Sequence, residues 1–494
     1  MQQTQLVQLL KVLNEQELKA LNTFLKRKPD KIKKVIEPLF DYLRKFAPAY
    51  NSPKLNRAVV LKKVFKKSSV TSPQLNKIAF QLKAMVEDFL VTYDLANDKL
   101  LKRRLLLEAL QRRNHPAFPK ESRSLIKELN QQVSAQSVEK DYLALFQLNH
   151  ALWSNINTQK VDTDFEVLLN TNEYLDAFYW RNKLTLILEA KTSKSIIATP
   201  IDLSQITNLP FALESNKTIA HYPTIQLLVK TIRMVDSSQI VDYQVVKKAL
   251  LTTVQQLTKK DAQDIFVTLT NFYNKHKGEN PAFWKTEAFE LYAFAHENNL
   301  LTDNGRMRYI EYCNAAIAGI ITKNFAWSAT FIEENKMLLS PKVRDLIYAY
   351  IKAFFHFQKQ EFDQVIQLLK SIDLMDSFTY NLDINIQTLN LRVFFERWAA
   401  NDFLPKEEQN WLLDQLRKFE HYIIGHKKLP IIKKENYLRF ASFFRLLVTA
   451  IEANSPQIPQ LKHIQKDLTI TNAVELREWL KNTLARLIAN LPHS

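Results

Sequence analysis

The stretch that decides the fold is residues 315–373, which read AAIAGIITKNFAWSATFIEENKMLLSPKVRDLIYAYIKAFFHFQKQEFDQVIQLLKSID. Its pattern predicts four helices in two hairpins, and the second hairpin repeats the first after 37 residues. The repeated positions are Ala316, Phe325, Ser328 and Ile332, which recur as Ala353, Phe362, Val365 and Leu369. Because one helix pair cannot bury its own apolar face, a period of this size predicts stacked helix pairs.

The same pattern continues on both sides of this stretch. A preceding helix pair, at 261–276 and 281–298, carries Ala288, Tyr292 and Ala295, which keep the spacing of small, aromatic and small residues. Further helices are expected over 382–398, 406–424, 432–454 and 473–490. Since convincing strand-like alternation is absent, the expected fold class is all-α.

Residues 261–400, under a third of the chain, resemble tetratricopeptide (TPR) repeats. The matching positions are Ala288, Tyr292 and Ala295, then Ala316, Phe325 and Ile332, then Ala353, Phe362 and Leu369. The sequence departs from the repeat at Lys352, where a leucine is usual, and at His356, where an aromatic residue is usual, and no glycine adjoins Ala316 or Ala353. The resemblance implies a right-handed α-solenoid of helix hairpins with a concave binding surface, and it implies no catalytic residue.

Breaks in the helical pattern predict three domains. Residues 1–116 are expected to form a basic N-terminal bundle of five helices, the first running over 1–27. Residues 117–216 are expected to be a helical linker region with an irregular crossing loop at 195–216. Residues 217–494 are expected to hold the solenoid and its C-terminal capping helices.

Positive charge is concentrated at the N-terminal end. Residues 1–113 hold 24 of the 68 Lys and Arg but only 10 of the 51 Asp and Glu, so they contribute +14 to the formal net charge of +17. Such asymmetry indicates an acidic partner for this end, namely nucleic acid, an acidic protein or an anionic membrane surface.

A candidate surface for such a partner is formed by basic residues of the first five helices. Its members are Lys31, Lys33, Lys34, Lys62, Lys63, Lys66, Lys67, Lys77, Lys83, Lys102, Arg103, Arg104, Arg112 and Arg113. A short helix, a turn at 68–73 and a longer helix resemble a helix-turn-helix in outline. The longer helix, however, offers mainly Asn76, Lys77, Gln81 and Lys83 for reading base edges, and no wing hairpin is visible. A lysine-rich solvated surface is therefore the competing interpretation.

Several classes of protein are disfavoured by composition. The chain has four glycines, and none is close to another. The glycine-rich phosphate-binding motifs GxxxxGK[ST] and GxGxxG therefore cannot occur. Cys313 is the only cysteine, which excludes intrachain disulfides and fits a reducing compartment. The N-terminal residues lack the pattern of a signal peptide, and no apolar run reaches the roughly 20 residues of a membrane span. A cytoplasmic location is expected.

Metal and catalytic motifs are weak. Asp162, Asp164, Glu166 and Glu173 match acidic places of a calcium loop, but Val167 occupies the place where that loop needs glycine. The ten histidines form no HExxH motif, and no GxSxG elbow is present. We therefore expect no catalytic, cofactor-binding or metal-binding residues, although a triad assembled from distant residues stays open.

Two functions follow as expectations. The first is a non-enzymatic scaffold or adaptor that binds a protein or peptide on the concave face of its helical repeats. The alternative is a nucleic-acid-binding regulator that contacts phosphates through its basic N-terminal bundle. The sequence leaves the partner's identity and the oligomeric state open.

Overall fold

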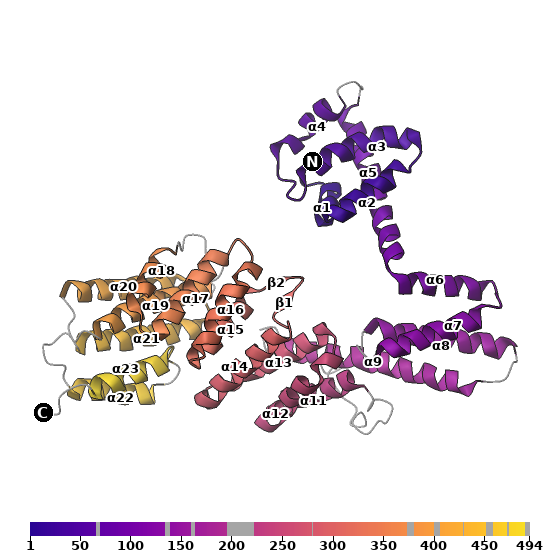
Figure 1. Ribbon diagram of the computed structural model, residues 1–494. Helices are drawn as coiled ribbons and strands as arrows, with labels where there is room; N and C mark the ends of the chain where they lie inside the picture. Colours follow the sequence, from indigo (N-terminus) through magenta and orange to yellow (C-terminus); the bar gives the residue numbers. More distant parts are fainter. Residues whose placement is uncertain are drawn as a thin grey trace. The chain divides into compact units, whose positions relative to one another are not determined.

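The computed structural model consists almost entirely of α-helices, with one short β-hairpin (Figure 1). It describes residues 1–65, 70–133, 139–159, 164–194, 222–278, 280–372, 380–399, 406–427, 429–450, 458–471 and 474–489. The all-α fold class is therefore confirmed for these residues. The crossing loop expected at 195–216 lies outside them, as does Asp373.

The chain divides into two compact units. Unit 1 comprises residues 1–130 and 144–171, and unit 2 comprises residues 131–143 and 172–494. The three-domain division expected from the sequence stays a prediction.

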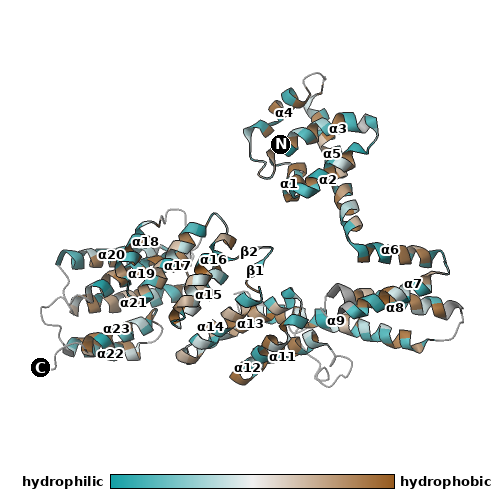
Figure 2. Ribbon diagram, in the orientation of Figure 1, coloured by the Kyte–Doolittle hydropathy of each residue, from teal (hydrophilic) through white to brown (hydrophobic). Residues whose placement is uncertain are grey.

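Unit 1 begins with a group of helices around one apolar core. These helices are α1 (Gln5–Val12), α2 (Glu15–Lys26), α3 (Asp30–Leu43), α4 (Arg57–Val64) and α5 (Ser72–Asn97), with short 3-10 turns at Arg44–Phe46 and Pro53–Leu55. Leu10, Leu39, Phe40, Leu82 and Val86 are completely buried in this core. Hydrophobic and hydrophilic residues both occur along these helices (Figure 2), and the hydrophobic ones supply the core.

The expectation of one helix over residues 1–27 is wrong. The structure breaks it between α1 and α2, where Asn14 starts a new helix with a capping box. The Glu17 backbone N–H donates to Asn14 Oδ1 at 2.9 Å, and the Asn14 N–H donates to Glu17 Oε2 at 2.7 Å. These reciprocal bonds satisfy two backbone N–H groups at the start of α2, where a helix offers its own N–H groups no acceptor.

The fifth expected bundle helix, α6 (Lys99–Arg112), is outside the α1–α5 core. Leu107 is its one fully buried side chain, and Arg103 and Arg104 instead bond to Glu128 and Gln147. Those partners lie on α7 (Phe118–Val133) and α8 (Glu139–Gln159). Helix α6 also contacts α5, so its place in the expected N-terminal bundle stays a prediction.

Unit 2 contains α9 (Phe165–Lys194) from Asn172 onward and a succession of helices in which each packs on the next. They are α11 (Pro223–Ser237), α12 (Ile240–Thr253), α13 (Lys259–His276), α14 (Pro281–Glu297), α15 (Tyr309–Ile321), α16 (Phe325–Asn335), α17 (Arg344–Gln358), α18 (Phe362–Lys370), α19 (Tyr380–Ala399), α20 (Lys406–Gly425), α21 (Ile431–Ala450), α22 (Ile458–Ile470) and α23 (Arg477–Ala489). Short 3-10 turns lie at Val254–Gln256 and Lys336–Leu338. Alternate helices also touch, since α17 contacts both α15 and α19.

The 37-residue repeat is reproduced in the backbone of two turns. Lys323 ends the α15–α16 turn with φ 62°, and Gln360 ends the α17–α18 turn with the same φ. In the first turn Asn324 N–H bonds to Gly319 O at 2.9 Å, and in the second Glu361 N–H bonds to His356 O at 3.0 Å. Each is the hydrogen bond that closes a helix C-terminus with a left-handed residue.

The repeated side chains occupy equivalent places. Ala316 and Ala353 are completely buried on α15 and α17, as are Ser328 and Val365 on the helices that follow. Gly319 allows α15 and α16 to approach closely, because a Cβ atom there would lie 2.4 Å from Ser328 Oγ.

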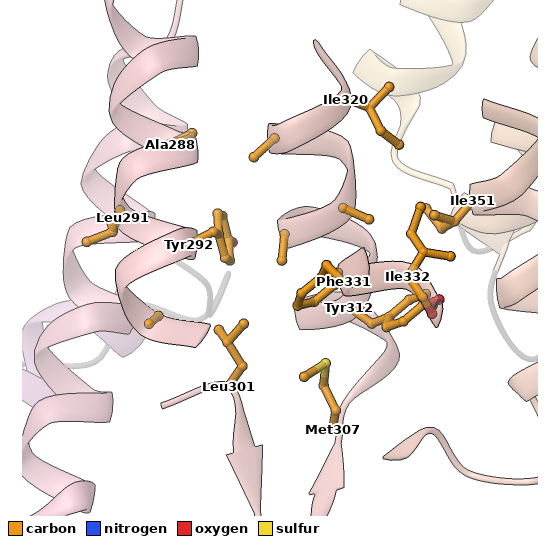
Figure 3. Close-up of a cluster of buried hydrophobic side chains, with 14 of the residues drawn as sticks. Ala288, Leu291, Tyr292, Leu301, Met307, Tyr312, Ile320, Phe331, Ile332 and Ile351 are labelled. Carbon is orange, nitrogen blue, oxygen red and sulfur yellow. Dashed lines mark hydrogen bonds between the residues drawn. The ribbon is translucent and has the colours of Figure 1, made fainter. Parts of the chain in front are cut away.

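The short hairpin was not expected from the sequence. Strands β1 (Thr302–Asp303) and β2 (Arg306–Met307) pair around Asn304 and Gly305, which both have positive φ. Asn-Gly is the favoured dipeptide of a tight hairpin turn. Figure 3 shows Leu301 and Met307, at the base of the hairpin, beside buried side chains of α14 and α15. The hairpin thus closes one end of the α14–α15 contact.

Candidate functional site

The predicted basic surface lies in unit 1, on four helices and the residue after the last of them. Exposed members are Lys34, Lys62, Lys63, Lys77, Lys102, Arg112 and Arg113, and half-buried members are Lys33, Lys83, Arg103 and Arg104. Lys66, Lys67 and the side chain of Lys31 lie outside the described residues.

About half of these cations are engaged within the chain. Arg103 pairs with Glu128, Arg104 bonds to Gln147, and Lys83 Nζ lies 2.9 Å from Glu87 Oε1. Arg112 and Arg113 donate to carbonyl oxygens of their own helix.

Five exposed lysines of this surface differ from the residues above in their internal bonding. Within the described ranges, no ion pair or side-chain hydrogen bond involves Lys34, Lys62, Lys63, Lys77 or Lys102. We call these five residues the exposed lysine set. They are the part of the predicted surface that can contact an anion without breaking an internal bond.

Helix α5 presents the side chains that were expected of a recognition helix, with one addition. Asn76, Lys77 and Gln81 are exposed, whereas Lys83 is held by Glu87. The addition is Phe80, whose side chain is 69% exposed on the same helix. An exposed aromatic ring beside lysine is a feature of surfaces that stack on unpaired bases as well as of protein contacts.

A second group of polar side chains lies in unit 2, on four alternate helices. Cys313 comes from α15, Tyr350 from α17, Arg392 from α19 and Tyr437 from α21. Burial raises the pKa of Tyr350, Cys313 and Tyr437 raise it further, and the positive charge of Arg392 lowers it. We call these four residues the donor cluster.

Arg392 is the unusual member of the donor cluster, because it is a cation with only 7% of its surface exposed. Its Nε donates to Thr388 O at 3.2 Å, and its guanidinium carbon lies 5.1 Å from the centroid of the Phe357 ring. In the part of the chain that the structure describes, its terminal nitrogens make no hydrogen bond. Burial lowers the pKa of this guanidinium to about 10, and nearby Tyr350 and Glu396 oppose that shift.

The other members remain protonated at neutral pH. Burial raises the pKa of Tyr437 to about 12, with a smaller contribution from Glu475. Burial also raises the pKa of the Cys313 thiol to about 12, assisted by Glu311. A thiol in that state is a poor nucleophile, so the cluster offers hydrogen-bond donors rather than covalent chemistry.

Sequence reasoning missed this cluster, since it used Cys313 to exclude intrachain disulfides and named none of the other three residues. Arg392 stands between Leu391 and Val393 within an apolar run, and no local motif marks it. A charged residue on the buried stripe of a helix is the one signal that could have identified it.

The acidic residues and histidines considered as metal ligands take part in ion pairs, a helix start and ring stacking, where the structure describes them. Asp164 lies 3.6 Å from Arg123, and Glu166 lies in the first turn of α9. His356 Nδ1 lies 2.5 Å from Glu361 Oε2 in the repeated turn, and His276 stacks on Phe272. Among the described residues, no group of three or more His, Cys, Asp or Glu side chains is arranged to hold a metal ion.

Comparisons with known proteins give no relative: no family model, no curated protein and no solved structure matches the chain. In the described part of the chain, no helix is both long and apolar enough to cross a membrane.

Proposed function

We propose that the protein is a non-enzymatic, cytoplasmic scaffold in which a basic N-terminal bundle precedes a right-handed α-solenoid of TPR-like hairpins. Its partner, a protein or peptide, binds on the concave face of the solenoid. The repeated turn at Lys323 and Gln360 supports this architecture, because identical turns stack successive helix pairs in the same way.

Arg392 is the observation that carries the proposal. A buried cation is costly unless hydrogen-bonding partners satisfy it, and the terminal nitrogens of Arg392 are offered none by the described residues. The planar guanidinium matches a carboxylate, which it can bind through two parallel N–H···O bonds. Tyr350 and Tyr437 add hydroxyl donors to the same cluster. The proposed partner therefore contributes a carboxylate to the donor cluster.

The test is binding of the full chain to an array of peptides that differ only in their carboxylates. Peptides with Asp, Glu or a free C-terminus should bind more tightly than the matched Asn, Gln or amidated peptides. The substitution Arg392→Met should weaken the carboxylate-bearing peptides about tenfold or more, since a hydrogen bond to a charged group contributes about 1.5–3 kcal/mol.

Arg397→Met is the matched control, because Arg397 is an exposed arginine of the same helix. Its substitution should leave the peptide preference unchanged. Equal binding of the acid and amide peptides by the wild-type chain would rule out the carboxylate, and equal losses in both variants would rule out Arg392 as its site.

The exposed lysine set favours the second candidate function, a nucleic-acid-binding regulator. Five lysines without an internal partner in the described ranges can each neutralise one phosphate. Phe80 on α5 supplies an apolar face for a base beside Lys77.

Binding of the full chain to single-stranded and duplex DNA, titrated against salt, tests this function. If the exposed lysine set makes the contacts, the slope of log K against log salt should be about −4.5 or shallower, since each phosphate contact on duplex contributes about −0.9. Replacing Lys62 and Lys63 by Gln should make the slope shallower by about two. Absence of binding at low salt would exclude the regulator.

A further inference from the structure

The turn between α20 and α21 combines exposed isoleucines with lysines. Residues 424–434 read IGHKKLPIIKK, with four lysines and no acidic residue. Ile424 in the last turn of α20 is 59% exposed, and Ile431 and Ile432 at the start of α21 are 75% and 71% exposed. Leu429 between them is only 4% exposed, so the turn is anchored while its isoleucines face solvent.

A further isoleucine lies at the same end of the neighbouring helix. Ile470 is the last residue of α22 and is 70% exposed. The chain just after α22 is tied to the first turns of α21, because Glu475 N–H donates to Asn436 O at 3.3 Å and Lys433 Nζ lies 2.7 Å from Glu475 Oε1. We call Ile424, Ile431, Ile432 and Ile470, together with the lysines described in the next paragraph, the isoleucine tip.

The charged groups around these isoleucines are mostly positive. Lys427 is exposed within the turn, and Lys434 Nζ donates to Ile424 O at 2.9 Å, which holds its ammonium beside that isoleucine. Lys466 is exposed one helical turn before Ile470.

The acidic groups nearby are paired. Glu475 bridges to Lys433, Glu435 lies 3.3 Å from Arg439, and Asp467 lies 3.3 Å from His463. The isoleucine tip therefore joins apolar side chains to an excess of positive charge.

Large apolar side chains at helix ends would gain free energy by leaving water. A lipid interface offers apolar depth below a layer of headgroups, and lysines around an inserted side chain can reach anionic headgroups. Nucleic acid would satisfy the lysines but not the isoleucines. We propose that the isoleucine tip docks the protein peripherally on an anionic membrane surface, with the isoleucines inserted at the interface and the lysines on the headgroups.

This docking is separate from the proposed scaffold function, because it uses neither Arg392 nor the exposed lysine set. A failure of either proposal leaves the other standing. If both hold, the isoleucine tip would localise the scaffold at a membrane surface.

The test is co-sedimentation of the full chain with vesicles of phosphatidylcholine alone or mixed with phosphatidylserine. The wild-type chain should bind the mixed vesicles and not the neutral ones. The double substitution Ile424→Ser and Ile431→Ser should weaken binding by roughly tenfold or more, and Lys427→Gln should weaken it about fivefold.

Val241→Ser is the matched control, because Val241 is 69% exposed on α12 and lies outside the tip. It should bind the vesicles like the wild-type chain, and circular dichroism should show every variant folded. Absence of wild-type binding to the phosphatidylserine vesicles would overturn the proposal. Binding that is lost with Lys62→Gln and Lys63→Gln but retained by the isoleucine variant would also overturn it, since the N-terminal lysines would then be responsible.

Discussion

Arg181→Met is expected to lower the free energy of unfolding of unit 2 by about 3–5 kcal/mol, the usual cost of breaking a buried ion pair from one side. Arg181 on α9 donates through Nη2 to both oxygens of Asp261 on α13, at 2.8 and 2.9 Å. The two side chains are only 8% and 5% exposed. Without the arginine, the Asp261 carboxylate would stay buried, and among the described residues its one remaining hydrogen bond would come from the Thr258 hydroxyl, at 2.7 Å. Urea denaturation of the full chain measures the loss.

Two further variants separate the effect of burial from that of losing any ion pair. Adding Asp261→Leu to Arg181→Met should recover part of the loss, because the orphaned carboxylate is removed with its partner. Lys260→Met, at the residue before Asp261, is the matched control. It breaks an exposed pair with Asp264, in which the lysine is 72% exposed, so it should cost under about 1 kcal/mol. If Lys260→Met proved as costly as Arg181→Met, burial could not be the cause.

The repeat was predictable because its physics is local. Ala316 and Ala353 must be small where two helices touch, and Ser328 and Val365 are buried on the adjoining helix. Such positions leave a periodic trace in the sequence. Helix boundaries between 261 and 298 also match the prediction closely, since the observed helices are Lys259–His276 and Pro281–Glu297. Periodicity and capping residues are sufficient for elements of this kind.

Two missed features had local signals. Asn14 followed by Glu17 is a capping box that marks the start of α2, and Asn304-Gly305 is the dipeptide of a tight hairpin turn. Both were outweighed by the apolar pattern around them. Short polar motifs therefore deserve priority over a continuous apolar stripe when helix boundaries are assigned.

Other features had no local signal. Lys323 and Gln360 adopt the left-handed conformation that usually favours glycine, and the backbone hydrogen bonds that close the two helix C-termini hold them there. The donor cluster joins residues from 313 to 437, and its members come together only when alternate helices stack. The basic surface was visible as charge, but its division into paired and unpaired cations depended on partners such as Glu128.

Glu396 is expected to hold the last helix, α23, against α19. Its carboxylate on α19 accepts hydrogen bonds from three side chains of α23: Trp479 Nε1 at 2.8 Å, Thr483 Oγ1 at 3.4 Å and Arg486. The Glu396 side chain is only 8% exposed. Glu396→Ala should therefore cost about 2–4 kcal/mol, because it leaves the half-buried indole N–H of Trp479 and the buried hydroxyl of Thr483 without their acceptor and removes the charge partner of Arg486.

The loss of Glu396 should appear first in α23, which has no other charged bond to α19 among the described contacts. Amide hydrogen exchange in Arg477–Ala489 should accelerate more than exchange in α17. Glu396→Gln, which keeps an acceptor for Trp479, should cost about half as much. Glu478→Ala, on an exposed pair 3.7 Å from Lys481, is the matched control and should change exchange little. Uniform acceleration throughout unit 2 would instead mean that α23 unfolds only together with the other helices, so that Glu396 stabilises the whole unit rather than the docking of its last helix.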